Sequence, residues 1–449
     1  MFQNEQDKRI GLSGGGHVIL VKMMAWLRIF LVCCLAVFIE VGWGPALSRP
    51  GLLATAADLP SVNKFYLNQK DYREYIDFFK EVFEVVGKNY YHEVQNKDFM
   101  RFVYLFNTKI YGPLKRSGKS KKYIKWRSAA FLVDALKAED DIFSRFFPPK
   151  DAERFETEAL GKRIDLGIEG SVTSDGFVVR WIEPRSDAYE KGLRQGDILL
   201  VLNGQQAIGL AQEEIQKILK PLEGETVEME FWDASDEKEK AMDVVSKEYF
   251  KQAVFKIDVD IPNVFCIQIE RFNRMTAEDM QILMEEVLAK EDSRLIIDLR
   301  DNPGGPPLAA QAISAFFLTP NQEFAYFQKK NRPKALLHVP EIPEELRFDG
   351  PMAILVNEKS GSASELFSGI MQRRGRATLI GQNTAGQVFL KSMFYLSDNS
   401  MVLLVTARGH HPDGQVFSFS GVRPDIRSEK KELIRYAAEY LSSLPAHDR

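Results

Sequence analysis

Between residues 250 and 430, apolar, strand-like runs alternate with helix-like segments. Helices are expected over 276–289, 307–317 and 363–374, and the strand-like runs read VFCIQI, RLIIDLR, MAILVN, RATLIG and MVLLVT. Short apolar runs separated by helices are typical of a sheet that is covered on both faces. The pattern therefore predicts an α/β layered core, closed by an amphipathic helix over 428–442.

Upstream of this core the pattern changes twice, which fits a chain of 449 residues with several domains. Residues 58–160 are expected to be helical, and one stripe has the 3,4 spacing of a buried helix face: Tyr75, Phe78, Phe79, Val82, Phe83 and Val86. Residues 161–246 read as short strands with turns and one helix near 211–220. We therefore expect a multidomain α+β and α/β chain whose core occupies residues 247–449.

An apolar run near the N-terminus predicts export. It extends over the 11 uncharged residues Ile29–Ile39 and follows the basic residues Lys22 and Arg28. Crossing a bilayer takes about 20 apolar residues, whereas a signal peptide needs about 7–15. Residues 1–57 are therefore expected to be a signal peptide, with an uncleaved membrane anchor as the alternative. Either interpretation places the protein in the periplasm or cell envelope, and the second anchors it to the inner membrane.

Composition argues against several other classes of function. The net charge of −4 argues against a nucleic-acid partner. The three cysteines, Cys33, Cys34 and Cys266, form neither a disulfide framework nor a metal motif, and the 6 histidines are scattered. The sequence therefore predicts no metal ion and no cofactor.

Two motifs within residues 161–246 indicate peptide binding. The segment LGIEG places Leu166, Gly167 and Ile168 in a loop that contains a glycine, and RSDAYEKGLRQGDILLVLNG follows at 185–204. These segments resemble a PDZ domain. In that family the loop's backbone N–H groups bind the terminal carboxylate of a peptide, which extends the sheet as an added strand. The resemblance implies that these three residues bind the C-terminal ends of substrates.

Two turns in the core contain groups that hydrolysis of an amide requires: a hydroxyl and oxyanion donors. VNEKSGSASE places Ser362 between an apolar strand and a helix that begins near Ala363, where free N–H groups favour negative charge. LIIDLRDNPGG ends a second strand in Gly304 and Gly305, whose flexible backbone can bring another N–H close. Taken alone, each segment also fits a helix cap or a tight turn.

Together the segments are more specific. DLRxNPGG, VNxxSxSASE and GRAxxIGxxTxG, in that order and after a PDZ-like module, resemble the C-terminal processing (tail-specific) serine proteases. The resemblance extends from about residue 62 to residue 430. It implies that Ser362 is the nucleophile and that the N–H of Ala363 and of a glycine, Gly304 or Gly305, form the oxyanion hole. It also implies protein or peptide substrates with exposed C-termini.

The chain departs from this family at the catalytic base. The family's lysine directly follows T-x-G, but here Thr384-Ala385-Gly386 precedes Gln387, and a lysine appears only at Lys391. Many members have a glutamine at that later position, so the two residues look exchanged. On a regular strand both point to the same face, about 13 Å apart, so a bulge would help Lys391 to approach. A lysine also needs a lowered pKa to act as a base.

Two interpretations of this departure are open. In the first, the protein is an exported serine endopeptidase with Lys391 as base and Gln387 in the exchanged position; His410 or His411 is a further candidate base. In the second, Lys391 is an exposed strand lysine, and the protein is a catalytically inactive peptide-binding or adaptor relative. Retention of both SGSASE and DLRDNPGG favours the enzyme.

Overall fold

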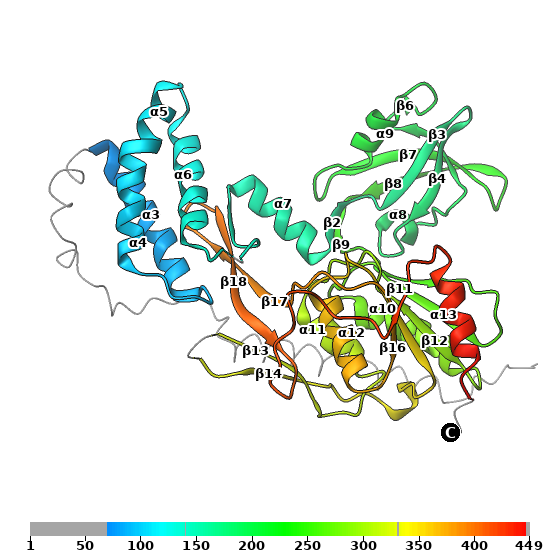
Figure 1. Ribbon diagram of the computed structural model, residues 1–449. Coiled ribbons are helices and arrows are strands. Elements are labelled where there is room, and N and C mark those ends of the chain that lie inside the picture. Colours follow the sequence, from blue (N-terminus) through cyan, green and yellow to red (C-terminus); the bar gives the residue numbers. More distant parts are fainter. Residues whose placement is uncertain (1–69, 140, 330–331, 446–449) are drawn as a thin grey trace, which may run out of the picture. The chain divides into compact units, whose positions relative to one another are not determined.

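The computed structural model describes residues 70–449 except 140, 330–331 and 446–449 (Figure 1). These residues fall within one compact unit, Leu67–Arg449. The expected signal peptide or anchor at residues 1–57 lies outside the described residues. Within the described part of the chain, no helix combines the length and the apolar character that crossing a membrane requires.

A helical region opens the described chain. Its elements are α3 (Lys70–Asn89), α4 (Asn96–Leu105), the π-helical turn η2 (Phe106–Ile110), α5 (Tyr111–Arg116) and α6 (Lys121–Leu136). The predicted aromatic stripe lies on α3, and all of it is buried except the half-buried Phe83. Phe79 packs edge-on against Phe102 and Phe106, with ring centroids 5.2 Å and 4.9 Å apart. The predicted helical character is confirmed over Lys70–Leu136, and the spacing of the stripe buries an aromatic core.

The strand-rich module that follows is a sheet in the order β3-β4-β5-β7-β8, with β6 paired to β5. Its elements are β3 (Ile168–Thr173), β4 (Gly176–Ile182), α8 (Asp187–Glu190), β5 (Ile198–Leu202), β6 (Gln205–Gln206), α9 (Gln212–Ile218), β7 (Thr226–Asp233) and β8 (Lys238–Val245). Exposed and buried residues alternate along all of β7, as expected for a sheet with one face on a core. β3 is an edge strand of this sheet.

Short elements flank this module on both sides in sequence. β1 (Arg145–Phe147) and α7 (Pro149–Leu160) precede a two-stranded pair formed by β2 (Lys162–Asp165) and β9 (Lys247–Phe250). β2 and β9 run antiparallel, so they bring the start and the end of the module together.

The core is a six-stranded sheet in the order β10-β11-β12-β15-β16-β19. β10 is antiparallel to β11, and the other neighbours are parallel. The strands are β10 (Val254–Ile257), β11 (Val264–Ile269), β12 (Arg294–Asp298), β15 (Met352–Val356), β16 (Thr378–Gly381) and β19 (Ile426–Arg427). The helices are α10 (Thr276–Leu288), α11 (Pro307–Ser314), α12 (Ala363–Arg373) and α13 (Leu433–Ser442).

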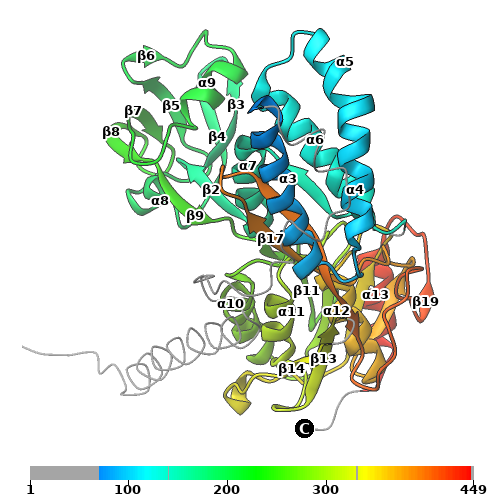
Figure 2. The same ribbon diagram turned by 90° about the vertical axis from the view of Figure 1, so that its left-hand side faces the viewer.

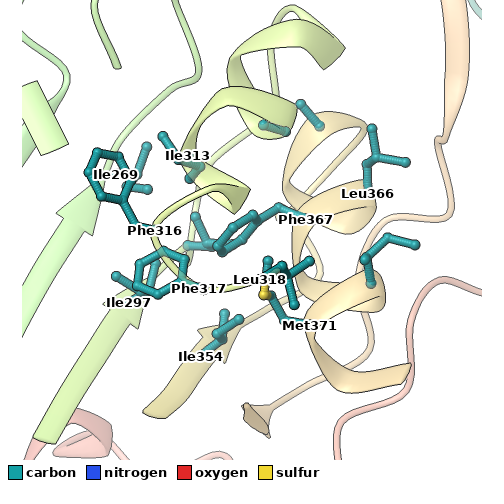
Figure 3. Close-up of a cluster of buried hydrophobic side chains, with 14 of the residues drawn as sticks. Ile269, Ile297, Ile313, Phe316, Phe317, Leu318, Ile354, Leu366, Phe367 and Met371 are labelled. Carbon is teal, nitrogen blue, oxygen red and sulfur yellow. The ribbon is translucent and has the colours of Figure 1, made fainter. Parts of the chain in front are cut away.

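Alternate residues of the core strands face two different helix layers. Leu295 and Ile297 belong to the cluster of α10, α11 and α12, whereas Ile296 belongs to the cluster of α13. α11 and α12 lie side by side in Figures 1 and 2, and Figure 3 shows Phe317 and Phe367 packed over the sheet. The predicted α/β layered core is confirmed, because strands buried on both faces read as continuous apolar runs.

A second sheet corrects one prediction. It has the order β1-β18-β13-β14, with β17 paired to β18, and consists of β13 (Glu323–Gln328), β14 (Ala335–His338), β17 (Phe389–Tyr395) and β18 (Met401–His410) in addition to β1. The run MVLLVT was expected in the layered core, but it begins β18. Val402, Leu404 and Val405 are buried with the aromatic residues of the helical region. An apolar run looks the same whichever partner covers it, so periodicity could not separate the two sheets.

Candidate active site

Ser362 lies at the junction between β15 and α12 in a strained backbone conformation. Its φ of 54° is positive, which is uncommon for a residue other than glycine, and only 8% of the residue is exposed. Its N–H donates to Glu365 Oε2 at 2.8 Å, which helps to hold the conformation. Strained positions of this kind cluster at functional sites because surrounding contacts must fix them.

The glycine turn after β12 lies directly against Ser362. A Cβ added to Gly304 would lie 2.5 Å from the carbonyl oxygen of Gly361 and 2.7 Å from Cβ of Ser362, and φ is 98°, so this position requires glycine. Two segments far apart in sequence are therefore in close contact, as the motif order predicted.

Two backbone N–H groups near this contact have no acceptor among the described residues. One belongs to Ala363, the first residue of α12, where the helix itself offers no partner. The other belongs to Gly305. The N–H of Gly304, in contrast, donates to Oδ1 of Asn302 at 2.8 Å. Of the two glycines singled out in the sequence, Gly305 is therefore the one with an available donor.

Asn302 connects these segments, and sequence reasoning missed it. It is fully buried, and its side-chain nitrogen donates to the carbonyl of Ile269 at 2.7 Å. Its own carbonyl accepts from the N–H of Gly361 and from the hydroxyl of Ser364, both at 2.9 Å. Two signals were available: Asn302 is the asparagine of the DLRxNPGG motif, and asparagine is common in tight turns for local reasons.

Glu365 is a second residue that sequence reasoning missed. Its buried carboxylate accepts hydrogen bonds from four groups, at 2.6–2.8 Å: the N–H of Ser362, Gly386 and Gln387, and the hydroxyl of Thr384. Burial raises the pKa of this carboxyl, and the four hydrogen bonds oppose that rise. Glu365 therefore connects the Ser362 segment to residues 384–387. The sequence signal was a glutamate three residues after a serine at a helix start.

Gln387 occupies the position where the resemblance implied a lysine. Its N–H bonds to Glu365, and its Oε1 lies 3.7 Å from where a Cβ on Gly361 would lie. The side chain is half-buried. The amide of Gln387 therefore lies beside the turn that carries Ser362.

Lys391 lies on β17 next to an irregularity in its pairing with β18. Leu390 pairs with Ala407 but Lys391 pairs with Val405, so Thr406 is an extra residue on β18. The extra residue is on β18 and not on the strand that carries Lys391, and Gln387 precedes β17, so the expectation that both residues lie on one regular strand is wrong. The side-chain nitrogen lies 4.3 Å from the centre of the Phe143 ring. Phe143 and Lys391 are far apart in sequence, so this contact forms only in the folded chain.

The surroundings of Lys391 change its acidity. Burial lowers the pKa of the ammonium group, and the charge of Glu365 acts in the opposite direction. Within the described part of the chain, Lys391 has neither an ion pair nor a hydrogen bond from its ammonium group, and none connects it to Ser362. Lys391 is half-buried, and is therefore not the exposed strand lysine of the alternative interpretation.

The two candidate histidines, His410 and His411, make their contacts with residues other than Ser362. His410 stacks on Tyr326, with ring centroids 4.6 Å apart, and its Nδ1 is 3.0 Å from the carbonyl of Arg408. His411 stacks on Phe417, and burial lowers its pKa to about 4. His411 also lies 3.6 Å from a Cβ built on Gly369, about two turns along α12 from Ser362. Neither ring has a hydrogen bond to Ser362 among the described residues.

The predicted peptide-binding loop is internally bonded in this structure. The N–H of Leu166 donates to the carbonyl of Leu219 at 3.2 Å, and the N–H of Gly167 donates to Oδ1 of Asp165 at 2.7 Å. Gly167 has a φ of 72°, which explains the glycine, and Ile168 begins β3. Neighbouring acceptors therefore take the N–H groups of Leu166 and Gly167 in this structure, and the peptide-binding role of the loop stays a prediction.

The described residues contain no candidate metal-binding site. Across the described residues, no group of three or more His, Cys, Asp or Glu side chains is placed to hold an ion. Cys266 is a free, buried thiol on β11, and burial raises its pKa to about 12.

Comparison with known families agrees with the geometry. Residues 263–428 match the model of peptidase family S41, and residues 154–232 match the PDZ domain model. Residues 263–428 are therefore similar to peptidase family S41, and residues 154–232 are similar to a PDZ domain.

Individual relatives are proteases by name. A probable CtpA-like serine protease from Staphylococcus haemolyticus is 24% identical over 315 residues, which cover 68% of this chain and 62% of the relative. The chloroplastic carboxyl-terminal-processing peptidase 1 of Arabidopsis thaliana is 26% identical over 316 residues, or 68% of this chain and 64% of the relative. The chain thus spans less than two thirds of the length of these curated relatives.

A solved structure agrees at the level of the fold. The tricorn protease matches with a TM-score of 0.52 and 16% identity, over 82% of this chain and 36% of that one. The predicted family and fold class are confirmed. The relatives' names favour the peptidase interpretation and give no support to the inactive alternative.

Proposed function

We propose that this protein is a serine endopeptidase of the C-terminal processing type, with Ser362 as its nucleophile. The observation that carries the proposal is the strained Ser362 at the start of α12, beside the N–H groups of Ala363 and Gly305, which have no acceptor in the described part of the chain. A hydroxyl next to two free donors is the arrangement that stabilises the oxyanion formed during acyl transfer.

Lys391 is the proposed general base. Burial lowers its pKa, so a larger fraction is neutral near pH 7 than for an ordinary lysine. Its nitrogen has no hydrogen bond to Ser362 in this structure, so the long side chain changes rotamer to reach the hydroxyl. Catalytic hydrogen bonds are often long without substrate and shorten in the complex. Gln387, beside Gly361, would orient the lysine.

The reaction then proceeds in two steps. The oxygen of Ser362 attacks the scissile carbonyl carbon and gives its proton to Lys391, while the carbonyl oxygen becomes an anion facing the N–H groups of Ala363 and Gly305. Collapse of this intermediate breaks the C–N bond, and the leaving amine takes the proton from Lys391. Water then gives a proton to Lys391 and attacks the ester, which releases the acid and restores Ser362.

The proposed substrates are proteins with exposed C-terminal ends. A PDZ domain supports this choice because such domains bind peptide ends along a sheet edge. The apolar run Ile29–Ile39 supports export to the periplasm or cell envelope, with the chain either released or anchored to the inner membrane. In this proposal residues 58–160, 161–246 and 247–449 act as helical, PDZ and protease domains.

The test is cleavage of an unfolded reporter protein that ends in apolar residues. We expect Ser362→Ala to reduce the rate by at least about 1,000-fold, whereas Ser174→Ala, an exposed serine in the PDZ module, leaves it unchanged. Circular dichroism confirms that each variant is folded. A wild-type chain that binds the reporter but cuts it no faster than Ser362→Ala would instead establish the inactive, peptide-binding alternative.

A further inference from the structure

The edge of the PDZ sheet is already partly occupied by a side chain of the same domain. β3 is the edge strand, so the backbone groups along its outer side are those that an added peptide strand would use. In this structure Gln212, the first residue of α9, bonds to that side twice. Its Oε1 accepts from the N–H of Val172 at 3.0 Å, and its Nε2 donates to the carbonyl of Gly170 at 2.9 Å.

The amide of Gln212 has the same chemistry as a peptide unit. It offers one carbonyl oxygen and one N–H to the strand, and it fills one donor and one acceptor position on β3. Gly170 and Val172 are two residues apart on β3, so their backbone groups point to the same edge of the sheet. A peptide strand and Gln212 therefore compete for the same two positions.

The C-terminal end of α9 occupies a second backbone group that the predicted peptide-binding loop would offer to a peptide. Leu219 follows the last residue of the helix, and its carbonyl accepts from the N–H of Leu166 in the loop predicted to bind a carboxylate. Ile215 and Leu219 are buried in the module's core, so α9 is fixed along β3 by packing as well as by these bonds. Groups of α9 therefore occupy hydrogen-bonding positions both on the edge strand β3 and in the loop before it.

We propose that Gln212 is an internal occupant of the peptide-binding edge and that a substrate must displace it to bind. This inference rests on the proposed function, which assigns peptide binding to the PDZ domain. A peptide that offers only backbone groups exchanges two hydrogen bonds for two and gains little. Net affinity must then come from the terminal carboxylate and the end side chains. Gln212 thereby weakens every ligand by the same factor, and measurable binding is left to peptides that add the contacts of a C-terminal end.

The experiment measures binding of a fluorescein-labelled peptide that ends in apolar residues, using chains that also carry Ser362→Ala so that no cleavage occurs. We expect Gln212→Ala to bind about tenfold more tightly than the parent, since the competing amide is gone. The matched control is Gln216→Ala, an exposed glutamine on the same helix, which should bind like the parent. The same peptide with a C-terminal carboxamide should bind more weakly than the free acid but gain the same factor from Gln212→Ala, because the cost of displacing Gln212 is common to both.

Hydrogen exchange supplies a second measurement. The N–H of Val172 should exchange faster in free Gln212→Ala than in the parent, and peptide should restore its protection. Equal or weaker peptide binding by Gln212→Ala than by Gln216→Ala overturns the inference, as does a peptide that binds none of the variants. Failure of the proposed function is distinguishable, because it appears as absent cleavage by the Ser362-intact chain while the Gln212 effect on binding persists.

Discussion

The ammonium nitrogen of Lys391 lies 4.3 Å from the centre of the Phe143 ring and, within the described chain, has no acidic partner at ion-pair distance. Other lysines of this protein are paired: Lys125 with Asp398 and Lys240 with Asp233, both at 2.6 Å. An aromatic face compensates only part of the hydration that a charged amine loses. The position of Lys391 therefore costs stability, as is common for groups whose pKa serves catalysis.

Replacing Lys391 by an apolar residue should raise stability and lower activity. We expect Lys391→Met to raise the free energy of unfolding by about 1 kcal/mol, since an unpaired cation is replaced by an apolar side chain of similar length. Reporter cleavage should fall to the level of Ser362→Ala. Urea unfolding measures the first effect, and Lys122→Met, at an exposed helix position, is the control that changes neither. A less stable Lys391→Met would contradict this view of the site.

The pH dependence of cleavage follows from the same lysine. The base must be neutral, and burial lowers the pKa of Lys391, so the rate should rise with pH through a midpoint below the ordinary value of about 10.4. In that window the unfolded chain binds more protons than the folded chain, so stability rises with pH. The stability advantage of Lys391→Met should therefore shrink between pH 7 and pH 10.5. A rate that is flat from pH 6 to pH 10 would rule out Lys391 as the base.

Exchanging the two residues back tests the rearranged site directly. Gln387 Oε1 lies close to the Gly361 position, so a lysine at 387 starts from the same backbone beside Ser362. We expect Lys391→Gln alone to lower kcat/KM by at least about 100-fold and Gln387→Lys with Lys391→Gln to recover most of that loss. If the double variant is no better than the single one, the two positions are not interchangeable.

The sequence predicted most of the core because its strands are continuous apolar runs between helices. The helix expected over 363–374 is α12, Ala363–Arg373, whereas the helix expected over 307–317 ends earlier, at Ser314. The order of motifs also placed the glycine turn against Ser362. The strands and helices depend on local pattern, which the sequence expresses directly, whereas the contact of the glycine turn with Ser362 was expected from the family resemblance.

The remaining features depend on contacts between distant residues. Asn302 bonds to Gly361, and Glu365 bonds to Gly386, and nothing in either local pattern indicates those partners. Phe143 covers Lys391 from a segment almost 250 residues away. The fold, not the local sequence, decides which side chains are enclosed and therefore whose pKa is altered.

Glu365 should be required for both stability and catalysis. Glu365→Gln keeps the size but replaces one acceptor oxygen by an NH₂ group, so two buried donors lose their acceptor. Since each unsatisfied buried donor costs about 1–3 kcal/mol, we expect the free energy of unfolding to fall by about 3 kcal/mol. Reporter cleavage at a temperature where the variant is folded should also fall, because residues 384–387 lose their connection to Ser362. Glu358→Gln, an exposed neighbour, is the control. Unchanged stability would show that the carboxylate is not needed as an acceptor.

Gly304 and Gly192 have similar φ values but different surroundings. Alanine at each position therefore distinguishes the cost of backbone strain from the cost of a steric contact. Gly304 and Gly192 have φ values of 98° and 104°, but an added Cβ at Gly192 has nothing within 4 Å, whereas at Gly304 it would lie 2.5 Å from the Gly361 oxygen. Gly192→Ala therefore bears only the conformational cost of about 1–2 kcal/mol and should leave cleavage intact. Gly304→Ala must also push the glycine turn away from Ser362, so we expect an additional loss of about 2 kcal/mol and cleavage reduced at least about 100-fold. Thermal unfolding and reporter cleavage of the two variants measure this difference, and equal effects at both positions would show that the contact between Gly304 and Gly361 is not needed for the site.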